Sequence, residues 1–178
     1  CVKYRKPLML GTTGFTEEQM AELEECAKTI PILIAHNTSK AVNLVYEIAR
    51  MLTESIGDES DIEIIEMHDN KKLDAPSGTA IALADVMNQA AGGDYEYVYD
   101  RSTRREKRPE KEIGISAVRG GTIVGDHDVI FAGQDEVITF SHMAYSRKLF
   151  ATGAVSAAKF LAGKPAGMYD MSRVIEGK

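Results

Sequence analysis

Residues 63–80, "EIIEMHDNKKLDAPSGTA", bring a strand, a group of titratable side chains and a helix start into one short stretch. The apolar run before His68 indicates a β-strand, and "SGTAIALADVMNQAAGG" from Ser77 onward indicates a helix that ends at a glycine pair. A charged loop therefore joins the end of a strand to the beginning of a helix.

The helix start has the properties of an anion-binding site. Pro76 is suited to the first turn of a helix, and Ser77 is suited to cap it. The backbone N–H groups of Ser77, Gly78 and Thr79 are expected to lack partners within the helix and to point outward at the positive end of its dipole. A carboxylate is a suitable ligand for such a site, and Gly78 lets it approach the backbone closely.

The residues just before this helix add acid–base chemistry. His68 ends the strand, and its imidazole ring can give or take a proton near neutral pH. Lys71 or Lys72 is placed to meet the same anion, and Asp74 is placed to orient a lysine or to hold the loop. We therefore expect a pocket for a small anionic substrate; the alternative is a solvated loop followed by an ordinary helix start.

The first part of the chain predicts a parallel α/β layer. "KPLMLGTTGFTEEQMAELEECAK" reads as strand, glycine turn and helix, with Thr16 and Gln19 forming a capping box. "IPILIAHN" is a second short strand, so the order is that of a βαβ unit. A helix is then expected from Ser39 to Gly57.

The second half of the chain changes to β-strands and then to a helix. The charged segment "YEYVYDRSTRREKRPEKE" is expected to be a solvated surface loop with one short edge strand. Three strands follow, separated by "GG" and "GQDE", and "GDHD" at 125–128 is read as a turn between strands. "SRKLFATGAVSAAKFLAG" predicts the last helix, and the tail beyond it is expected to be mostly irregular.

Composition excludes several classes of function. The net charge of -6 argues against a nucleic-acid or membrane-surface partner, because either would favour a basic face. No apolar run is long enough to span a bilayer, and the first residues do not form a signal peptide. Cys1 and Cys26 are expected to be free thiols, which favours a cytoplasmic location.

The motif at 63–80 resembles the signature of the 4-hydroxy-tetrahydrodipicolinate reductases, also called dihydrodipicolinate reductases. Ten positions match without a gap: Glu63, Glu66, His68, Lys72, Asp74, Pro76, Ser77, Gly78, Thr79 and Ala80. The similarity continues through "GTTGF", "VRGGTIVGDHDVIFAG", "SHMAYSR" and "AGMYDMSRV". The family reduces a small cyclic dicarboxylate on the diaminopimelate route to lysine, with hydride from NADPH or NADH.

The resemblance implies a role for particular residues. His68 would be the acid–base residue and Lys72 a proton donor. Ser77, Gly78 and Thr79 would bind one substrate carboxylate, and Arg147 would help with the second. Family members commonly have a second histidine where this chain has Asp69, so no substrate role is carried over to that position.

The resemblance also implies cofactor contacts and an assembly. The contacts with the nicotinamide cofactor would come from two turns: Gly11, Thr12 and Thr13 in the first, and Ala35, His36, Asn37 and Thr38 in the second. The second turn departs from the family at His36 and Thr38, so its contacts are expected mainly from main-chain atoms. The family also implies a homotetramer.

The fold expected from these patterns is α/β plus α+β. Residues 1–36 and 147–178 are expected to form the remnant of a Rossmann-type nucleotide-binding domain. Residues 37–146 are expected to form a substrate-binding and tetramerisation domain with a mixed sheet flanked by helices. The family's phosphate-binding G-x-G-x-x-G turn would lie upstream of Cys1, so we expect these residues alone to lack useful reductase activity.

Two other classes of protein remain possible from the residues. His68, Asp69 and His127 offer nitrogen and oxygen ligands for a metal-dependent hydrolase, although the family needs no metal. A non-catalytic module that assembles through its sheet is the third reading.

Overall fold

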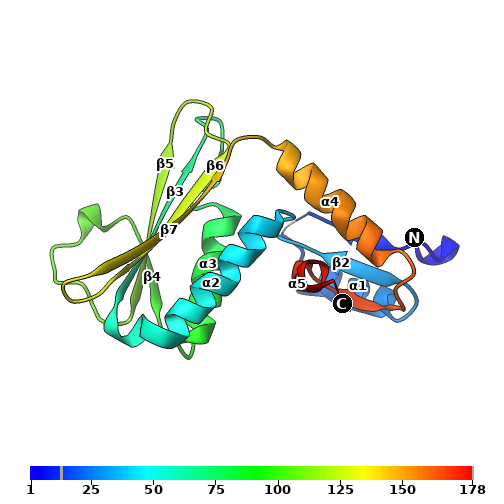
Figure 1. Cartoon of the computed structure of the whole chain (residues 1–178), viewed down its shortest axis with the longest axis horizontal. Helices are drawn as coiled ribbons and strands as arrows, with labels where there is room; N and C mark the ends of the chain where they lie inside the picture. The colour runs from blue at the N-terminus through cyan, green and yellow to red at the C-terminus, as the bar shows by residue number, and fades with distance from the viewer. Residues whose placement is uncertain (13, 178) are drawn as a thin grey trace. The chain divides into compact units, whose positions relative to one another are not determined.

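The computed structural model describes residues 1–12 and 14–177. Their contacts form two compact units, which are described separately: unit 1 is Cys1–Asn43 with Arg147–Lys178, and unit 2 is Leu44–Ser146 (Figure 1). The sequence predicted a boundary near Asn37, whereas the contacts place it after Asn43. The Asn43 side-chain amide donates to the main-chain oxygens of Asn37 and Ser39, both at 2.8 Å, and so joins these residues to unit 1.

Unit 1 is a three-stranded parallel sheet with helices. Its strands are β1 (Leu8–Leu10), β2 (Pro31–Ile34) and β8 (Gly167–Tyr169), in the order β1-β2-β8. Its helices are α1 (Glu17–Ala27), α4 (Lys148–Leu161) and α5 (Met171–Glu176), and α2 (Lys40–Ile56) begins here and continues into unit 2. The predicted capping box is confirmed, because the side chains of Thr16 and Gln19 each accept from the other's backbone N–H.

The prediction of a mostly irregular tail is wrong. Residues 167–169 form β8, which pairs with β2, and Asp170 caps α5 by accepting the N–H of Arg173 at 3.2 Å. A three-residue strand has no periodicity that a sequence pattern can show, and its partner lies far away in the chain.

Unit 2 is a five-stranded mixed sheet in the order β4-β5-β3-β6-β7. Its strands are β3 (Asp61–His68), β4 (Glu96–Tyr99), β5 (Glu112–Arg119), β6 (Gly125–Ala132) and β7 (Val137–Ala144). β4, β5 and β3 are parallel, while β6 and β7 are antiparallel to their neighbours. The predicted mixed sheet and short edge strand are therefore confirmed.

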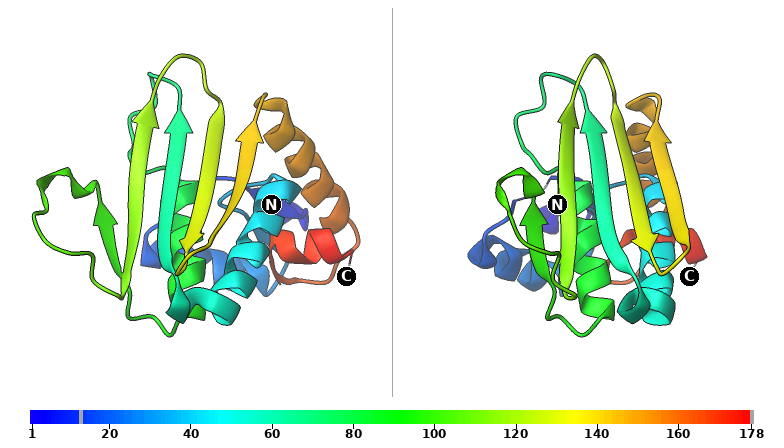
Figure 2. Two further views of the ribbon diagram at one scale, coloured as in Figure 1. Left: turned by 60° about the vertical axis from the view of Figure 1, so that its left-hand side comes forward. Right: turned by 90° about the vertical axis from the view of Figure 1, so that its left-hand side faces the viewer.

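Helices α2 and α3 (Gly78–Ala90) lie against one face of this sheet (Figure 2). Ile62 and Ile64 of β3 and Leu83 of α3 are fully buried in the core between them. On β6 the buried residues alternate with half-buried ones, which is the period of a strand with one face against the core. The face away from the helices carries exposed apolar side chains, including Val118, Val137 and Met143.

The connection between β4 and β5 is anchored rather than solvated. Glu112 is fully buried, Arg101 forms an ion pair with it, and Arg104 lies 3.9 Å from its second oxygen. Arg108 donates to the main-chain oxygen of Ile62 at 2.9 Å. The expectation of a solvated charged loop is wrong for these arginines, because each is bound to an acceptor on the sheet.

Candidate functional site

Strand β3 places two side chains of the candidate site, Glu66 and His68, on the same face of the sheet. Its burial alternates, and Glu66 follows Ile62 and Ile64 on the side that faces the helices. His68 lies two residues further on, so its ring projects from the same face at the end of the strand. The predicted strand end at His68 is confirmed.

The Glu66 carboxylate is the centre of the candidate site, a role that its place in the sequence motif does not indicate. It is fully buried and accepts two hydrogen bonds from Arg119, Nη1 to Oε2 at 2.8 Å and Nη2 to Oε1 at 2.7 Å. His68 Nδ1 lies 2.6 Å from Oε2, and the backbone N–H of Ser77 donates to Oε1 at 3.0 Å. Burial alone would raise the pKa of Glu66, but Arg119 and His68 outweigh burial and lower the pKa, so the carboxylate is charged.

Arg119 was missed because it is the end of a strand, and the sequence pattern marks only the following "GG" as a turn. It is the last residue of β5, where it pairs with His68 across the parallel ladder. Its guanidinium also donates to the main-chain oxygen of Asp74 at 2.7 Å, which holds the loop before α3. No local sequence signal indicates this pairing, because it depends on the strand register.

The start of α3 is as predicted, but one of its donors is already used. Ser77 is the N-cap, and its Oγ accepts the N–H of Ala80 at 3.1 Å. The expectation that the Ser77 N–H points outward without a partner is wrong, because it donates to the buried Glu66 carboxylate. Gly78 is exposed and Thr79 is half-buried, and their role in binding a carboxylate stays a prediction.

Lys72 is held by the loop, as the sequence suggested. Its Nζ lies 2.9 Å from Asp74 Oδ2, and this hydrogen bond lowers the pKa of Asp74. The Lys72 side chain is 23% exposed, so its ammonium group is held but remains within reach of solvent. One chain of contacts thus runs from Lys72 through Asp74, Arg119 and Glu66 to His68.

Asp69 takes part in a local turn. Its Oδ1 accepts the backbone N–H of Lys71 at 2.9 Å. The Asp69 carboxylate therefore accepts a hydrogen bond from the main chain of its own loop.

His127 is a buried neighbour of His68 and not part of a turn. It lies on β6, is 5% exposed, and its ring centroid is 5.2 Å from that of His68. Its Nε2 is 2.8 Å from Ser77 Oγ. Burial lowers the pKa of His127 to about 4, and the charges of His68, His142 and Lys72 add to the shift. In the sequence, His127 alternates with Val129 and Phe131, which indicates a position on the buried face of the strand but not a place beside His68.

The two predicted cofactor turns lie together in unit 1. Gly11 follows β1 and residues 35–38 follow β2, so both turns lie at the carboxyl ends of parallel strands, where nucleotides bind in α/β sheets. A Cβ on Gly11 would be 4.0 Å from the methyl group of Thr38, which shows that the turns are adjacent. A contact between these turns and the nicotinamide side of a cofactor stays a prediction, and the sequence contains no G-x-G-x-x-G turn for the pyrophosphate.

Side chains in the second turn have structural contacts. Thr38 Oγ1 donates to the main-chain oxygen of Phe150 at 2.8 Å, and a Cβ on Gly153 would lie 1.8 Å from the Thr38 oxygen, so α4 packs directly on this turn. Ala35 is buried, and Asn37 Oδ1 accepts the N–H of Ser39 at 2.9 Å.

The other predicted contact residues of unit 1 that the structure describes are at its surface. His36, Gly11 and Thr12 are exposed, as is Arg147 immediately before α4. Thr13 lies outside the described residues.

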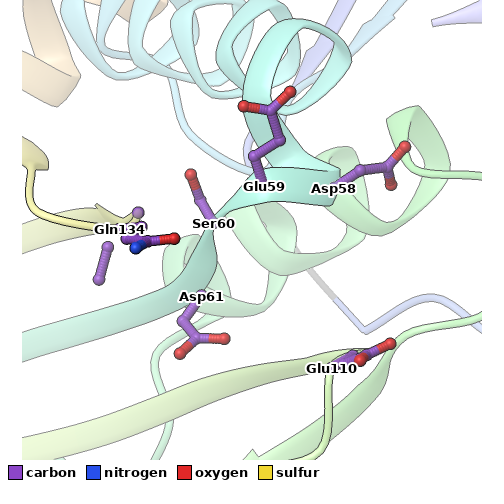
Figure 3. A pocket seen from close by; sticks show the side chains of 8 residues that line it. Asp58, Glu59, Ser60, Asp61, Glu110 and Gln134 are labelled. Carbon is purple, nitrogen blue, oxygen red and sulfur yellow. The ribbon is translucent and has the colours of Figure 1, made fainter.

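A cavity of about 420 Å³ lies at the opposite end of β3 (Figure 3). Its labelled side chains are Asp58, Glu59, Ser60, Asp61, Glu110 and Gln134. Four carboxylates in the lining make this cavity unsuitable for a dicarboxylate, because like charges repel.

The metal-dependent hydrolase has no structural support. Within residues 1–12 and 14–177, no group of three histidine, cysteine, aspartate or glutamate side chains is placed to hold a metal ion. His68 and His127 are adjacent, but His68 Nδ1 is engaged with Glu66 and His127 Nε2 with the Ser77 hydroxyl. In the same described residues, no helix is both long and apolar enough to cross a membrane.

The fold and the site define a class of protein first. A parallel α/β unit with cofactor-type turns, joined to a unit with a histidine, a lysine and a helix start at one strand end, is typical of a nucleotide-dependent oxidoreductase. Comparison with known proteins makes the assignment specific. Residues 1–38 match the model of the dihydrodipicolinate reductase N-terminus, and residues 41–175 match that of its C-terminus. The chain belongs to the dihydrodipicolinate reductase family, whose members are NAD(P)H-dependent oxidoreductases.

Individual relatives agree with the family models. The chain is 48% identical to the 4-hydroxy-tetrahydrodipicolinate reductase of Caldanaerobacter subterraneus subsp. tengcongensis, over 98% of this chain and 69% of the relative. It is 47% identical to the enzyme of the same name from Clostridium tetani, over 96% of this chain and 67% of the relative. This chain thus spans about two thirds of the length of these relatives.

A solved structure has the same fold. The dipicolinate-bound dihydrodipicolinate reductase from Paenisporosarcina sp. TG-14 matches with a TM-score of 0.75 and 24% identity, over 96% of this chain and 64% of that one. At this identity the likeness establishes the fold, and the predicted α/β plus mixed-sheet architecture is confirmed.

Proposed function

We propose that this chain carries the substrate site and the nicotinamide side of an enzyme that reduces 4-hydroxy-tetrahydrodipicolinate to tetrahydrodipicolinate with NADPH or NADH. The reaction belongs to the diaminopimelate route to lysine. The observation that carries the proposal is the single network around Glu66, which holds the His68 ring and the first residue before α3 on one carboxylate. An acid–base group and an anion-binding helix start are thereby fixed beside each other.

The charges of the site suit a dianion. Lys72 supplies an ammonium group, and the first turn of α3 supplies the backbone N–H groups of Gly78 and Thr79. Ser77 contributes by fixing the helix start and not by its own N–H, which Glu66 uses. Arg147 is our candidate for the second carboxylate.

NADPH or NADH, when bound, supplies a hydride to the unsaturated ring of the substrate. His68 or Lys72 then delivers the proton that the reduced substrate needs, and Lys72 also balances the charge of the nearer carboxylate. On the cofactor side, Gly11, Thr12, Thr13 and residues 35–38 contact the nicotinamide half. Because the Thr38 hydroxyl is bonded to Phe150, contacts from the second turn come from main-chain atoms.

Unit 1 is proposed as the nucleotide-binding part and unit 2 as the part that binds substrate and forms a homotetramer. Exposed Val118, Val137 and Met143 on the sheet face away from the helices support self-association, because apolar sheet faces are usually covered. A cytoplasmic enzyme with free thiols at Cys1 and Cys26 is consistent with this assignment.

Calorimetry with pyridine-2,6-dicarboxylate, a planar mimic of the substrate, tests the site. We expect Lys72→Ala to raise the dissociation constant about tenfold or more, because a charge-assisted hydrogen bond is worth about 1.5–3 kcal/mol. Lys71→Ala is the matched control, since Lys71 is the adjacent exposed lysine, and it is expected to change the constant less than about twofold. Equal binding by wild type and Lys72→Ala would contradict the proposed carboxylate site.

A further inference from the structure

The contact between His68 and Glu66 fixes where the imidazole carries its hydrogen. A charged carboxylate can only accept hydrogen bonds, so the Nδ1 that lies 2.6 Å from Glu66 Oε2 must be the donor. The neutral ring then has its hydrogen on Nδ1 and its lone pair on Nε2. Free imidazole side chains in water favour the opposite tautomer, so this contact imposes a particular state on His68.

The surroundings of Nε2 are consistent with its use as the reactive nitrogen. A Cβ on Gly125 would lie 2.9 Å from Nε2, so the absence of a side chain at this position leaves space beside that atom. The His68 side chain is 12% exposed, and its other nitrogen is occupied by Glu66.

The carboxylate is itself rigidly held. Arg119 binds both oxygens, and its guanidinium also donates to the main-chain oxygens of Val118 and Asp74, each at 2.7 Å. Ser77 N–H occupies Oε1 from the side of α3. Glu66 therefore has a fixed orientation from which it can fix the ring.

We propose that Glu66 is a positioning residue, which holds His68 in the Nδ1–H tautomer and leaves Nε2 as the nitrogen that gives and takes the proton. This inference rests on the proposed function only in taking His68 as the acid–base residue. In the proton step, the imidazolium loses its Nε2 hydrogen to the hydride-reduced substrate and returns to the neutral Nδ1–H form. Glu66 keeps its charge throughout and stabilises the imidazolium.

The competing explanation is that Glu66 and Arg119 form only a structural pair that anchors the start of α3. In that case the tautomer of His68 would not depend on Glu66. Glu66 on β3 and His127 on β6 contact the ring, Arg119 on β5 binds Glu66, and Lys72 and Asp74 lie in the loop that Arg119 holds.

The first test measures the tautomer directly in the wild-type chain. Long-range ¹H–¹⁵N spectra of the four histidines, above the pH at which His68 titrates, report which ring nitrogen carries the hydrogen. The His68 signals are assigned by their loss in His68→Gln. We expect the Nδ1–H tautomer for His68, and a dominant Nε2–H tautomer would overturn the inference.

The second test uses two variants that should act in opposite directions. Glu66→Gln removes the negative charge, so the midpoint of the His68 titration should fall by about one pH unit or more. Arg119→Gln removes the positive charge that competes for Glu66, so the midpoint should rise. Glu63→Gln is the matched control, because Glu63 lies on the same strand and is paired with Arg108 at 3.1 Å, without a histidine contact.

Shifts of the same sign in both variants, or shifts no larger than that of Glu63→Gln, would also overturn the inference. If Glu66→Gln does not fold, the wild-type tautomer and the direction of the Arg119→Gln shift still test the inference.

Binding of pyridine-2,6-dicarboxylate separates this inference from the proposed function. An Nδ1–H tautomer without binding would remove the proposed function and leave the positioning role, while binding with an Nε2–H tautomer would do the reverse.

Discussion

Unit 2 contains two fully buried carboxylates with different surroundings. Glu112 at the start of β5 is bound by Arg101 and lies near Arg104, both from the connection that precedes the strand. Glu66 on β3 is bound by one arginine, one histidine and one backbone N–H. The two side chains are equally inaccessible, so burial alone does not distinguish a structural carboxylate from a functional one.

The kind of partner makes the difference. Guanidinium groups remain charged at every accessible pH, so the Glu112 cluster can only anchor its loop. The Glu66 cluster contains an imidazole ring, which can both give and take a proton, and a helix start of the kind that binds anions. A buried carboxylate is therefore informative about function when a titratable group and a ligand-binding element share it.

The largest expected effect is on stability, in Arg119→Ala. This change leaves Glu66 charged and buried without its main partner, so the free energy of unfolding should fall by about 3 kcal/mol. Arg101→Ala should cost less than half as much, because Arg104 remains near Glu112. Urea unfolding at pH 7 measures both, and equal losses would show that the two carboxylates depend equally on their arginines.

The next effect is a dependence of the free energy of unfolding on pH. It is expected from the Glu66 cluster, which has the buried His127 as a neighbour, and not from the Glu112 cluster. His127 has its pKa lowered by burial from 6.5 to about 4, so the unfolded chain binds a proton in this range that the folded chain excludes. The free energy of unfolding should therefore fall as the pH drops from 6.5 towards 4, by about 3 kcal/mol in total. We expect His127→Gln to remove most of this slope.

Urea unfolding between pH 7 and 5, monitored through the amide signals of unit 2, measures how the free energy of unfolding changes with pH. This pH range lies above the one in which protonation of Glu66 contributes. Glu66 has a lowered pKa, so its own stabilisation is lost only as the pH falls below about 4.5. His36→Gln is the control, because His36 is an exposed histidine of unit 1. An unchanged slope in His127→Gln would contradict the prediction.

The smallest effect is expected for Asp69→His, which lies beside the Glu66 cluster but outside it. The variant loses the hydrogen bond from Lys71 N–H, which costs about 1 kcal/mol or less. Turnover by the protein that carries this chain should be intact, and the KM for substrate should be unchanged or lower, because a negative charge is removed. Steady-state kinetics measure this, and a large loss of kcat/KM would give Asp69 a role of its own.

Local patterns were sufficient for most of the fold. The capping box at Thr16, the cap at Ser77 and the strand ending at His68 are set by neighbours within a few residues, so the sequence predicts them. β8 and the anchored arginines of the β4–β5 connection were missed. Each depends on a partner that only the folded chain brings near.

The same distinction applies to the site. His68, Lys72 and the start of α3 lie in one short stretch, and their chemistry can be read from residue types and order. Arg119 and His127 reach the site through the register of β5 and β6 against β3, which no local pattern specifies. The hydrogen bond from the Ser77 N–H to Glu66 was not predicted either, because it links a strand to a helix across the loop.

The parallel sheet of unit 1 has a consequence for folding during translation. Its middle strand, β2, pairs on one side with β1 and on the other with β8, which begins only at Gly167. At about 5–20 residues per second, a ribosome needs roughly 7 to 27 seconds to translate the codons between the end of β2 and the start of β8. During that interval one edge of β2 lacks its partner strand, and by its end every strand of unit 2 has been translated. Unit 2 is thus able to fold before the sheet of unit 1 is complete.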